Sequence, residues 1–193
     1  MNKPTRFLFI RHGQTDWNVN RRWQGHIDTT LNETGRQQAE KLAQLLFDQE
    51  KNLDAIYTSD LQRAHATAEI IGKKFACTVK SDCRLREMHL GDAQGLFAHE
   101  VEQRFNVLRN GFDHIPNSES MKDVVDRVHH FLSEIALRHH GKTALVVTHK
   151  AVIKSLITHA GSHGEPTNCS VSVFEYNSSL QLPLLFLGIQ HIV

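Results

Sequence analysis

The sequence has little net charge and no long basic run. Its 193 residues contain 22 Lys and Arg against 21 Asp and Glu, which gives a formal net charge of +1. Proteins that bind nucleic acids or membrane surfaces owe much of their affinity to clustered Lys and Arg. We therefore expect neither a nucleic acid nor a membrane as the partner of this protein.

Long hydrophobic runs are also absent. A membrane-spanning helix needs roughly 18 or more apolar residues in a row, and the richest apolar run, Leu180 to Ile189, is interrupted by Gln181 and Pro183. Residues 1–7 lead directly into a short apolar run and show no signal core with a cleavage site. The apolar run near the C-terminus could pack on the domain itself or on a second copy in a homodimer.

Cysteine is scarce. Its three positions, Cys77, Cys83 and Cys169, form an odd set without the spacing of a metal site. Reduced thiols are the better interpretation, and they are typical of an intracellular compartment. We expect a cytoplasmic protein without disulfides.

Histidine, in contrast, is abundant, with 14 residues. They include the doublets His129-His130 and His139-His140 and the i, i+4 pair His159 and His163. A metal site is a poor explanation for them. Neighbouring residues of a helix point in different directions, glycines interrupt the i, i+4 pair, and no Glu completes an HExxH motif. We interpret these histidines as solvated surface residues and expect no metal.

Short β-rich runs alternate with longer helical patterns along the chain. The predicted strands are 7–10, 55–58, 143–148, 170–176 and 184–187, and the predicted helices are about 34–49, 60–75 and 120–140. This alternation is typical of a parallel sheet covered by helices. We expect one α/β domain over residues 1–193, with three layers and a mostly parallel central sheet flanked by helices.

Each predicted helix is preceded by a start signal. The signals are Thr34 with Gln37, Ser59 with Gln62, and Ser120 with Asp123. A Ser or Thr followed three residues later by a Gln or an acidic residue resembles a capping box, in which side chains bond the free amides of the first turn.

Polar residues follow the first three predicted strands. Arg11 and His12 come after the first, Arg63 shortly after the second, and His149 and Lys150 after the third. Ligands of open α/β sheets bind beyond the carboxyl ends of the strands, where helix N-termini point inward. Two Arg and two His at one edge would surround a phosphate dianion, because guanidinium groups match phosphate oxygens.

Neighbouring cations disfavour a further positive charge on an imidazole. A neutral His12 beside a bound phosphoryl group would be a nucleophile and could form a phosphohistidine. Arg11, Arg63 and His149 could then stabilise the charge that a metal stabilises in other phosphatases.

The leaving oxygen would still need a proton. Glu87 is the best candidate donor, since it follows an apolar run and partial burial would raise its pKa. Asp92 and Glu100 are alternatives nearby.

Several ordered motifs together resemble one known family. They are residues 11–18 (RHGQTDWN), 22–25 (RWQG), 59–64 (SDLQRA), 85–87 (LRE), 116–120 (PNSES), 146–149 (VVTH) and 168–171 (NCSV). This set resembles the histidine phosphatase superfamily, the phosphoglycerate mutase-like group, over most of the chain. The resemblance implies a mixed sheet flanked by helices and no requirement for a metal or other cofactor.

The resemblance also implies residue roles. His12 would be the phosphorylated nucleophile and Glu87 the proton donor. Arg11, Arg63 and His149 would hold the phosphate. The expected substrate-binding positions further include Asn18, which would face the pocket, and Gln24 and Gly25, which would approach the substrate.

Departures from the family pattern favour its phosphatase branch. Residues 88–90 (MHL) lack the Arg-His-Tyr run of phosphoglycerate mutases, and the chain is shorter than those mutases. Lys150 replaces a usual Gly, where it could bind a second anionic group of the substrate or point to solvent. Thr30 and Ser118 replace a usual Pro and Gly.

We therefore expect a metal-independent phosphomonoester hydrolase that acts on a small phosphorylated metabolite. A cofactor-dependent phosphoglycerate mutase and a non-catalytic phosphate-binding protein remain the alternatives.

Overall fold

The computed structural model describes residues 3–50, 53–177, 180 and 183–191. Within these ranges, six strands form one sheet in the order β3-β2-β4-β1-β5-β6. They are β1 (Thr5–Arg11), β2 (Ala55–Thr58), β3 (Val79–Ser81), β4 (Thr143–Thr148), β5 (Val171–Tyr176) and β6 (Leu184–Gln190). The first four are mutually parallel, whereas β5 is antiparallel to both β1 and β6. The predicted, mostly parallel sheet is confirmed.

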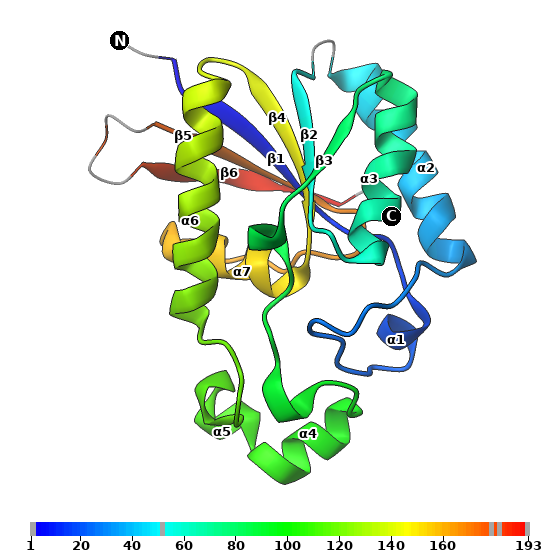
Figure 1. The fold of residues 1–193 in the computed structure, drawn as a ribbon, viewed down its shortest axis with the longest axis vertical. Helices are drawn as coiled ribbons and strands as arrows, with labels where there is room; N and C mark the ends of the chain where they lie inside the picture. The colour runs from blue at the N-terminus through cyan, green and yellow to red at the C-terminus, as the bar shows by residue number, and fades with distance from the viewer. Residues whose placement is uncertain (1–2, 51–52, 178–179, 181–182, 192–193) are drawn as a thin grey trace.

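Helices cover both faces of this sheet, as Figure 1 shows. The helices are α1 (Asp16–Val19), α2 (Glu33–Gln49), α3 (Gln62–Phe75), α4 (Ala98–Phe105), α5 (Val107–Asn110), α6 (Met121–Arg138) and α7 (Lys150–His159). Single 3-10 turns occur at Cys83–Leu85, Gly91–Ala93 and Phe112–His114. Helices α2 and α3 lie on one side of the sheet, and α6 and α7 lie on the other, which confirms the three layers (Figure 1).

The central strand β1 shows why both faces are covered. Phe7 and Phe9 belong to the buried cluster under α6 and α7, whereas Leu8 and Ile10 belong to the cluster under α2 and α3. All four side chains are at most 1% exposed. Successive side chains of a strand point to opposite faces, so a continuous apolar run is typical of a strand buried on both sides.

Some elements differ from their sequence-based predictions. The sequence did not predict five of the elements: β3, α1, α4, α5 and α7. The first four are short segments without a clear periodicity. Helix α7 was missed because it directly follows the polar end of β4. The last strand extends to Gln190 instead of ending at Leu187. In this strand Leu184 is buried against the domain, but Leu185 and Leu187 are exposed. The homodimer that could use this apolar run stays a prediction.

Two of the three predicted helix starts are wrong. The N-cap of α2 is Asn32, whose Oδ1 accepts a hydrogen bond from the Gly35 amide at 2.8 Å, and Thr34 already lies within the helix. Leu61 precedes α3 without any side-chain cap. The capping box of Ser120 with Asp123 at the start of α6 is confirmed.

The extra histidines are only partly solvated. His130 and His140 are exposed, but the ring of His129 packs against that of His159 with centroids 4.8 Å apart. His139 Nε2 lies 3.0 Å from the Tyr57 hydroxyl. The interpretation as surface residues is therefore wrong for one member of each doublet. No group of three or more His, Cys, Asp and Glu suited to a metal ion occurs in the described ranges.

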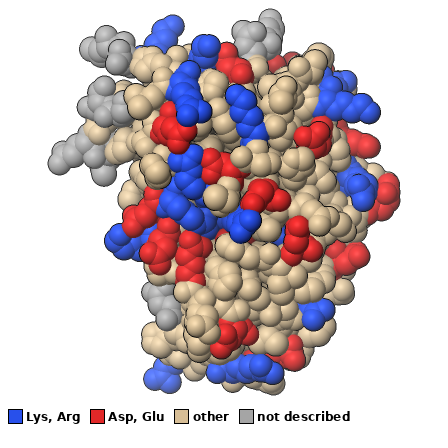
Figure 2. Space-filling model, viewed as in Figure 1, with Lys and Arg blue, Asp and Glu red and all other residues tan. Residues whose placement is uncertain are grey.

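The chain shows no bilayer-crossing helix within the ranges given above. Its cysteines Cys77, Cys83 and Cys169 are all unpaired. Basic and acidic side chains intermingle on the face drawn in Figure 2, where no large patch of one sign is seen.

The N-cap correction gives a stability prediction. Asn32→Ala should lower the free energy of unfolding by about 1 kcal/mol, because the Gly35 amide loses its acceptor. Thr34→Ala is the matched control and should change it by less than about 0.5 kcal/mol. Urea denaturation of both variants measures the difference, and an equal loss in the two would contradict the assignment.

Candidate active site

The two central histidines lie side by side because of strand register. Arg11, the last residue of β1, is opposite Thr148, the last residue of β4, so His12 and His149 leave adjacent parallel strands together. The His12 amide donates to the Thr148 carbonyl at 3.0 Å, which continues the ladder by one residue. The two rings have centroids 5.2 Å apart and are 2% and 0% exposed.

The His12 ring is held in one tautomer. Its Nδ1 lies 2.7 Å from the Gly13 carbonyl oxygen, and since a carbonyl only accepts, Nδ1 carries the proton. Burial, followed by the charges of Arg63 and Arg11, lowers the pKa of His12 well below its ordinary 6.5. The ring is therefore neutral near pH 7, and Nε2 keeps a free lone pair.

Two arginines bring positive charge to the site, and no carboxylate among the described residues contacts them directly. Arg63, at the start of α3 and 0% exposed, donates to the carbonyls of Ile27 at 3.0 Å and Gly25 at 2.7 Å. Arg11 donates to the Pro166 carbonyl at 3.1 Å. Burial lowers the pKa of Arg63 to about 10, so the guanidinium remains charged at neutral pH.

The site retains polar atoms without a hydrogen-bond partner. Arg11 Nε, Arg63 Nε and both ring nitrogens of His149 are buried without a partner in the part of the chain that the structure describes. Burial lowers the pKa of His149 well below 6.5, with Arg63 and His12 adding to the effect. A buried charge without a counter-ion is costly, so the arrangement suits a bound anion.

Glu87 brings a carboxyl group to the same site. Its Oε1 accepts hydrogen bonds from the Met88 amide at 3.0 Å and from the Ala151 amide, in the first turn of α7, at 3.1 Å. Burial raises the pKa of Glu87, although these amides and the charges of Arg63 and Arg11 oppose the rise. The alternative carboxylates are engaged elsewhere: Asp92 accepts from Asn117 and Glu100 caps α4.

A cavity of about 380 Å³ opens at this edge of the sheet. Seven of the sequence-predicted residues line it: Arg11, His12, Asn18, Gln24, Gly25, Glu87 and Lys150. Arg63 and His149 are fully buried and do not line the cavity, although the His149 ring lies next to that of His12. The structure thus brings the predicted nucleophile, acid and phosphate ligands together.

Sequence reasoning missed the rest of the lining. It consists of Arg22, Trp23, Leu90, Phe112, Met121, Ala151, Lys154 and Thr158. Half of these residues come from irregular segments or a 3-10 turn and half from α6 and α7, and they are of types that occur on any surface or core. The available signals were the motif at 22–25, which contains Arg22 and Trp23, and the i, i+4 spacing of Lys154 from Lys150.

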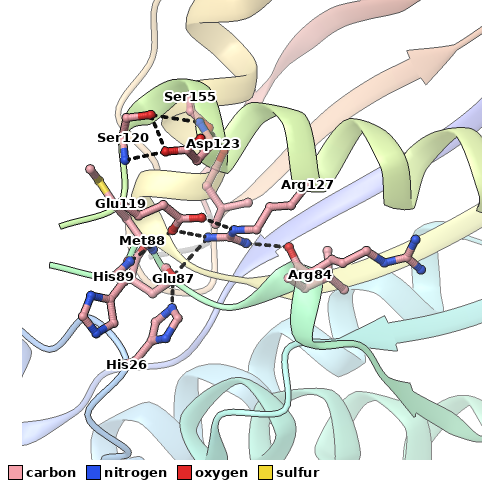
Figure 3. Close-up of polar contacts among 12 residues, drawn as sticks. His26, Arg84, Glu87, Met88, His89, Glu119, Ser120, Asp123, Arg127 and Ser155 are labelled. Atoms are coloured by element: carbon pink, nitrogen blue, oxygen red, sulfur yellow. Dashed lines mark hydrogen bonds and ion pairs between the residues drawn. The ribbon is translucent and has the colours of Figure 1, made fainter. Parts of the chain in front are cut away.

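The backbone of Glu87 is fixed from two sides, as Figure 3 shows. Arg127 of α6 donates to the carbonyl oxygens of Arg84 at 2.5 Å and Glu87 at 3.1 Å, while both oxygens of Glu119 accept from its guanidinium. His26 Nε2 donates to the Glu87 carbonyl at 2.7 Å. This network, also missed by sequence reasoning, holds the segment that carries the carboxyl group.

Comparison with known proteins identifies the family. The family model of the histidine phosphatase superfamily (branch 1) matches residues 7–183. The chain belongs to this superfamily. The resemblance inferred from the motifs is thereby confirmed.

Relatives in this superfamily are similar over most of their length. Phosphoglycerate mutase-like protein 4 of Arabidopsis thaliana is 40% identical over 179 residues, which are 86% of this chain and 77% of the relative. Metal-independent phosphoserine phosphatase of Arabidopsis thaliana is 36% identical over 183 residues, which are 89% and 76% of the two chains.

A solved structure shows the same fold. Mycobacterial glucosyl-3-phosphoglycerate phosphatase in complex with VO3 superposes with a TM-score of 0.84 at 29% identity, covering 94% of this chain and 96% of the other. The fold of this histidine phosphatase superfamily member is thus shared with a named phosphatase, in agreement with the predicted enzyme class.

The unpartnered donors predict strong stabilisation by an anion. Inorganic phosphate should raise the Tm beyond the effect of NaCl at equal ionic strength, and at 100-fold over its Kd it should add about 2.7 kcal/mol to the free energy of unfolding. Arg11→Met should abolish most of this gain because one phosphate ligand is lost.

Thermal denaturation of Arg36→Met provides the control, since Arg36 is exposed on α2 and does not line the cavity. It should retain the full phosphate effect. Equal stabilisation of Arg11→Met and the unmodified protein would mean that the anion binds elsewhere.

Proposed function

We propose that this protein is a phosphomonoester hydrolase that works without a metal, through a phosphohistidine at His12, on a small phosphorylated metabolite. The observation that carries the proposal is the state of the His12 ring. Its Nδ1 is committed to the Gly13 carbonyl, its pKa is lowered, and its Nε2 is free beside two buried arginines. A neutral imidazole in a cationic pocket is an activated nucleophile for a phosphate dianion.

In the first step, the Nε2 lone pair of His12 attacks phosphorus while the bond to the leaving oxygen breaks. The bonding electron pair goes to that oxygen, and Glu87 gives it a proton. Arg11, Arg63 and His149 hold the phosphoryl oxygens and stabilise their charge.

In the second step, a water molecule attacks phosphorus and Glu87, now a carboxylate, accepts a proton from it. The P–N bond breaks, its electron pair returns to Nε2, and inorganic phosphate leaves. The enzyme ends as it began, with a neutral His12 and a protonated Glu87.

Two named phosphatases among the similar proteins support hydrolysis, whereas another relative carries a phosphoglycerate mutase-like name. Both a metal-independent phosphoserine phosphatase and a glucosyl-3-phosphoglycerate phosphatase are among the similar proteins. A non-catalytic phosphate-binding protein would not need both a neutral His12 with Nδ1 committed to the Gly13 carbonyl and a carboxyl group with a raised pKa.

The direct assay is hydrolysis of an aryl phosphate with a chelator present. The proposal expects undiminished turnover in the chelator and loss of nearly all activity in His12→Ala. Retained activity in His12→Ala would overturn the mechanism. Interconversion of phosphoglycerates faster than their hydrolysis would instead favour a mutase.

The proton role of Glu87 predicts a dependence on the leaving group. Glu87→Gln should lower kcat for an alkyl phosphate about 10²- to 10⁴-fold, because an alkoxide leaves poorly without a proton. The loss should be much smaller for p-nitrophenyl phosphate, whose leaving group is stable as an anion. Steady-state kinetics on both esters measure the difference.

The pH profile provides a second readout. With the alkyl ester, the rate should fall at low pH as His12 is protonated, at a pH well below 6.5 because its pKa is lowered. The rate should fall again at higher pH as Glu87 loses its proton. This loss should occur at a higher pH than for an ordinary Glu, because burial raises the pKa of Glu87. Glu87→Gln should remove this alkaline limb.

Controls are Asp92→Asn and Glu100→Gln, which alter the alternative carboxylates. Both should keep the activity on both esters and the alkaline limb. If one of these controls lost activity selectively on the alkyl ester while Glu87→Gln kept its activity, the residue changed in that control would be the proton donor instead of Glu87.

A further inference from the structure

Two lysines line the same cavity as the aromatic pair of Trp23 and Phe112. Lys150 and Lys154 lie one turn apart on the same face of α7, and both contribute to the wall of the cavity that also contains His12. Their side chains are each 48% exposed, so the ammonium groups can meet both water and a ligand. Positive charge therefore extends from the proposed phosphate site along α7.

These two lysines share a single carboxylate. Lys150 Nζ lies 3.1 Å from Glu165 Oε2, and Lys154 Nζ donates to Glu165 Oε1. Glu165 itself does not line the cavity and is 60% exposed, in the loop after α7. Two ammonium groups against one carboxylate leave one uncompensated positive charge.

The apolar part of the lining cannot neutralise this charge. Its members Trp23, Leu90, Phe112 and Met121 are apolar, with the rings of Trp23 and Phe112 5.6 Å apart. Arg22 adds another cation, whose Nε donates to the Gly95 carbonyl. Glu87 is the one carboxylate in the described lining, and in the proposed mechanism it enters protonated.

We propose that Lys150 and Lys154 form a second anion subsite at the cavity, which selects phosphomonoesters whose leaving group carries a further anionic group, and that Glu165 occupies this subsite when no substrate is bound. The inference rests on the proposed function, in which the phosphoryl group of the ester lies against His12. The apolar wall then contacts the body of the leaving group.

Glu165 shows which ligand chemistry the subsite accepts. It presents two oxygens to two ammonium groups, one oxygen to each. A carboxylate or a second phosphate of a substrate offers the same pair of oxygens. Because an exposed ion pair contributes little to stability, a ligand can replace Glu165 at small cost.

The test compares three aryl phosphates that differ in one substituent: phenyl phosphate, 4-carboxyphenyl phosphate and phenylene 1,4-bisphosphate. The measured quantity is the ratio of kcat/KM for each charged ester to that for phenyl phosphate. Lys150→Met or Lys154→Met should lower the ratio about threefold, and the double variant about tenfold, as expected for loss of partly exposed charge contacts.

Glu165→Gln should act in the opposite direction and raise the ratio about threefold, because the competing carboxylate is removed. Lys122→Met is the matched control. It removes an exposed lysine of α6 that pairs with Asp126 at i, i+4 and does not line the cavity, and it should leave the ratio unchanged. High salt should reduce the ratio of the unmodified protein.

A larger ratio for the carboxylated or for the bisphosphorylated ester identifies which anion the subsite prefers, and either supports the proposal. Unchanged ratios in both lysine variants and in Glu165→Gln would overturn it. Turnover of phenyl phosphate reports the proposed function separately. If no ester is hydrolysed, calorimetry measures the Kd of each ester instead of kcat/KM. The affinity ratios of the charged esters to phenyl phosphate must then fall in the lysine variants and rise in Glu165→Gln.

Discussion

Burial of positive charge at the carboxyl edge of the sheet is the constraint on which the site depends. Arg63 is fully buried, Arg11 is largely enclosed, and both donate to backbone carbonyls instead of a carboxylate. Such an arrangement is costly without an anion. Burial, with the charge of Arg63 adding to it, lowers the pKa values of His12 and His149. A buried, positively charged site thus accounts both for affinity toward phosphate and for a neutral imidazole beside it.

The fold makes this arrangement possible by holding each group on a rigid element. Register between β1 and β4 places the two histidines together, and the first turn of α3 supplies Arg63. Glu87 comes from an irregular segment, yet Arg127 and His26 fix its backbone (Figure 3). Precise placement is needed because phosphoryl transfer relies on positioning and charge stabilisation.

Much of the candidate site was predictable from the sequence, whereas its surroundings were not. Buried strands such as 7–10 are recognisable by composition, and residues that follow parallel strands must meet at one edge. The N-cap at Asn32 was missed because Thr34 and Gln37 fit the capping pattern equally well, and only the backbone path decides between them. Trp23 and Phe112 meet only through tertiary packing of loops, which leaves no local pattern.

The central claim is that the phosphoryl group passes through His12 before it reaches water. The stereochemical course at phosphorus tests this claim most directly, with a phosphate ester made chiral by oxygen isotopes or sulfur. Two successive in-line displacements, one by His12 and one by water, would give overall retention of configuration. Inversion, the outcome of a single direct attack by water, would contradict the account.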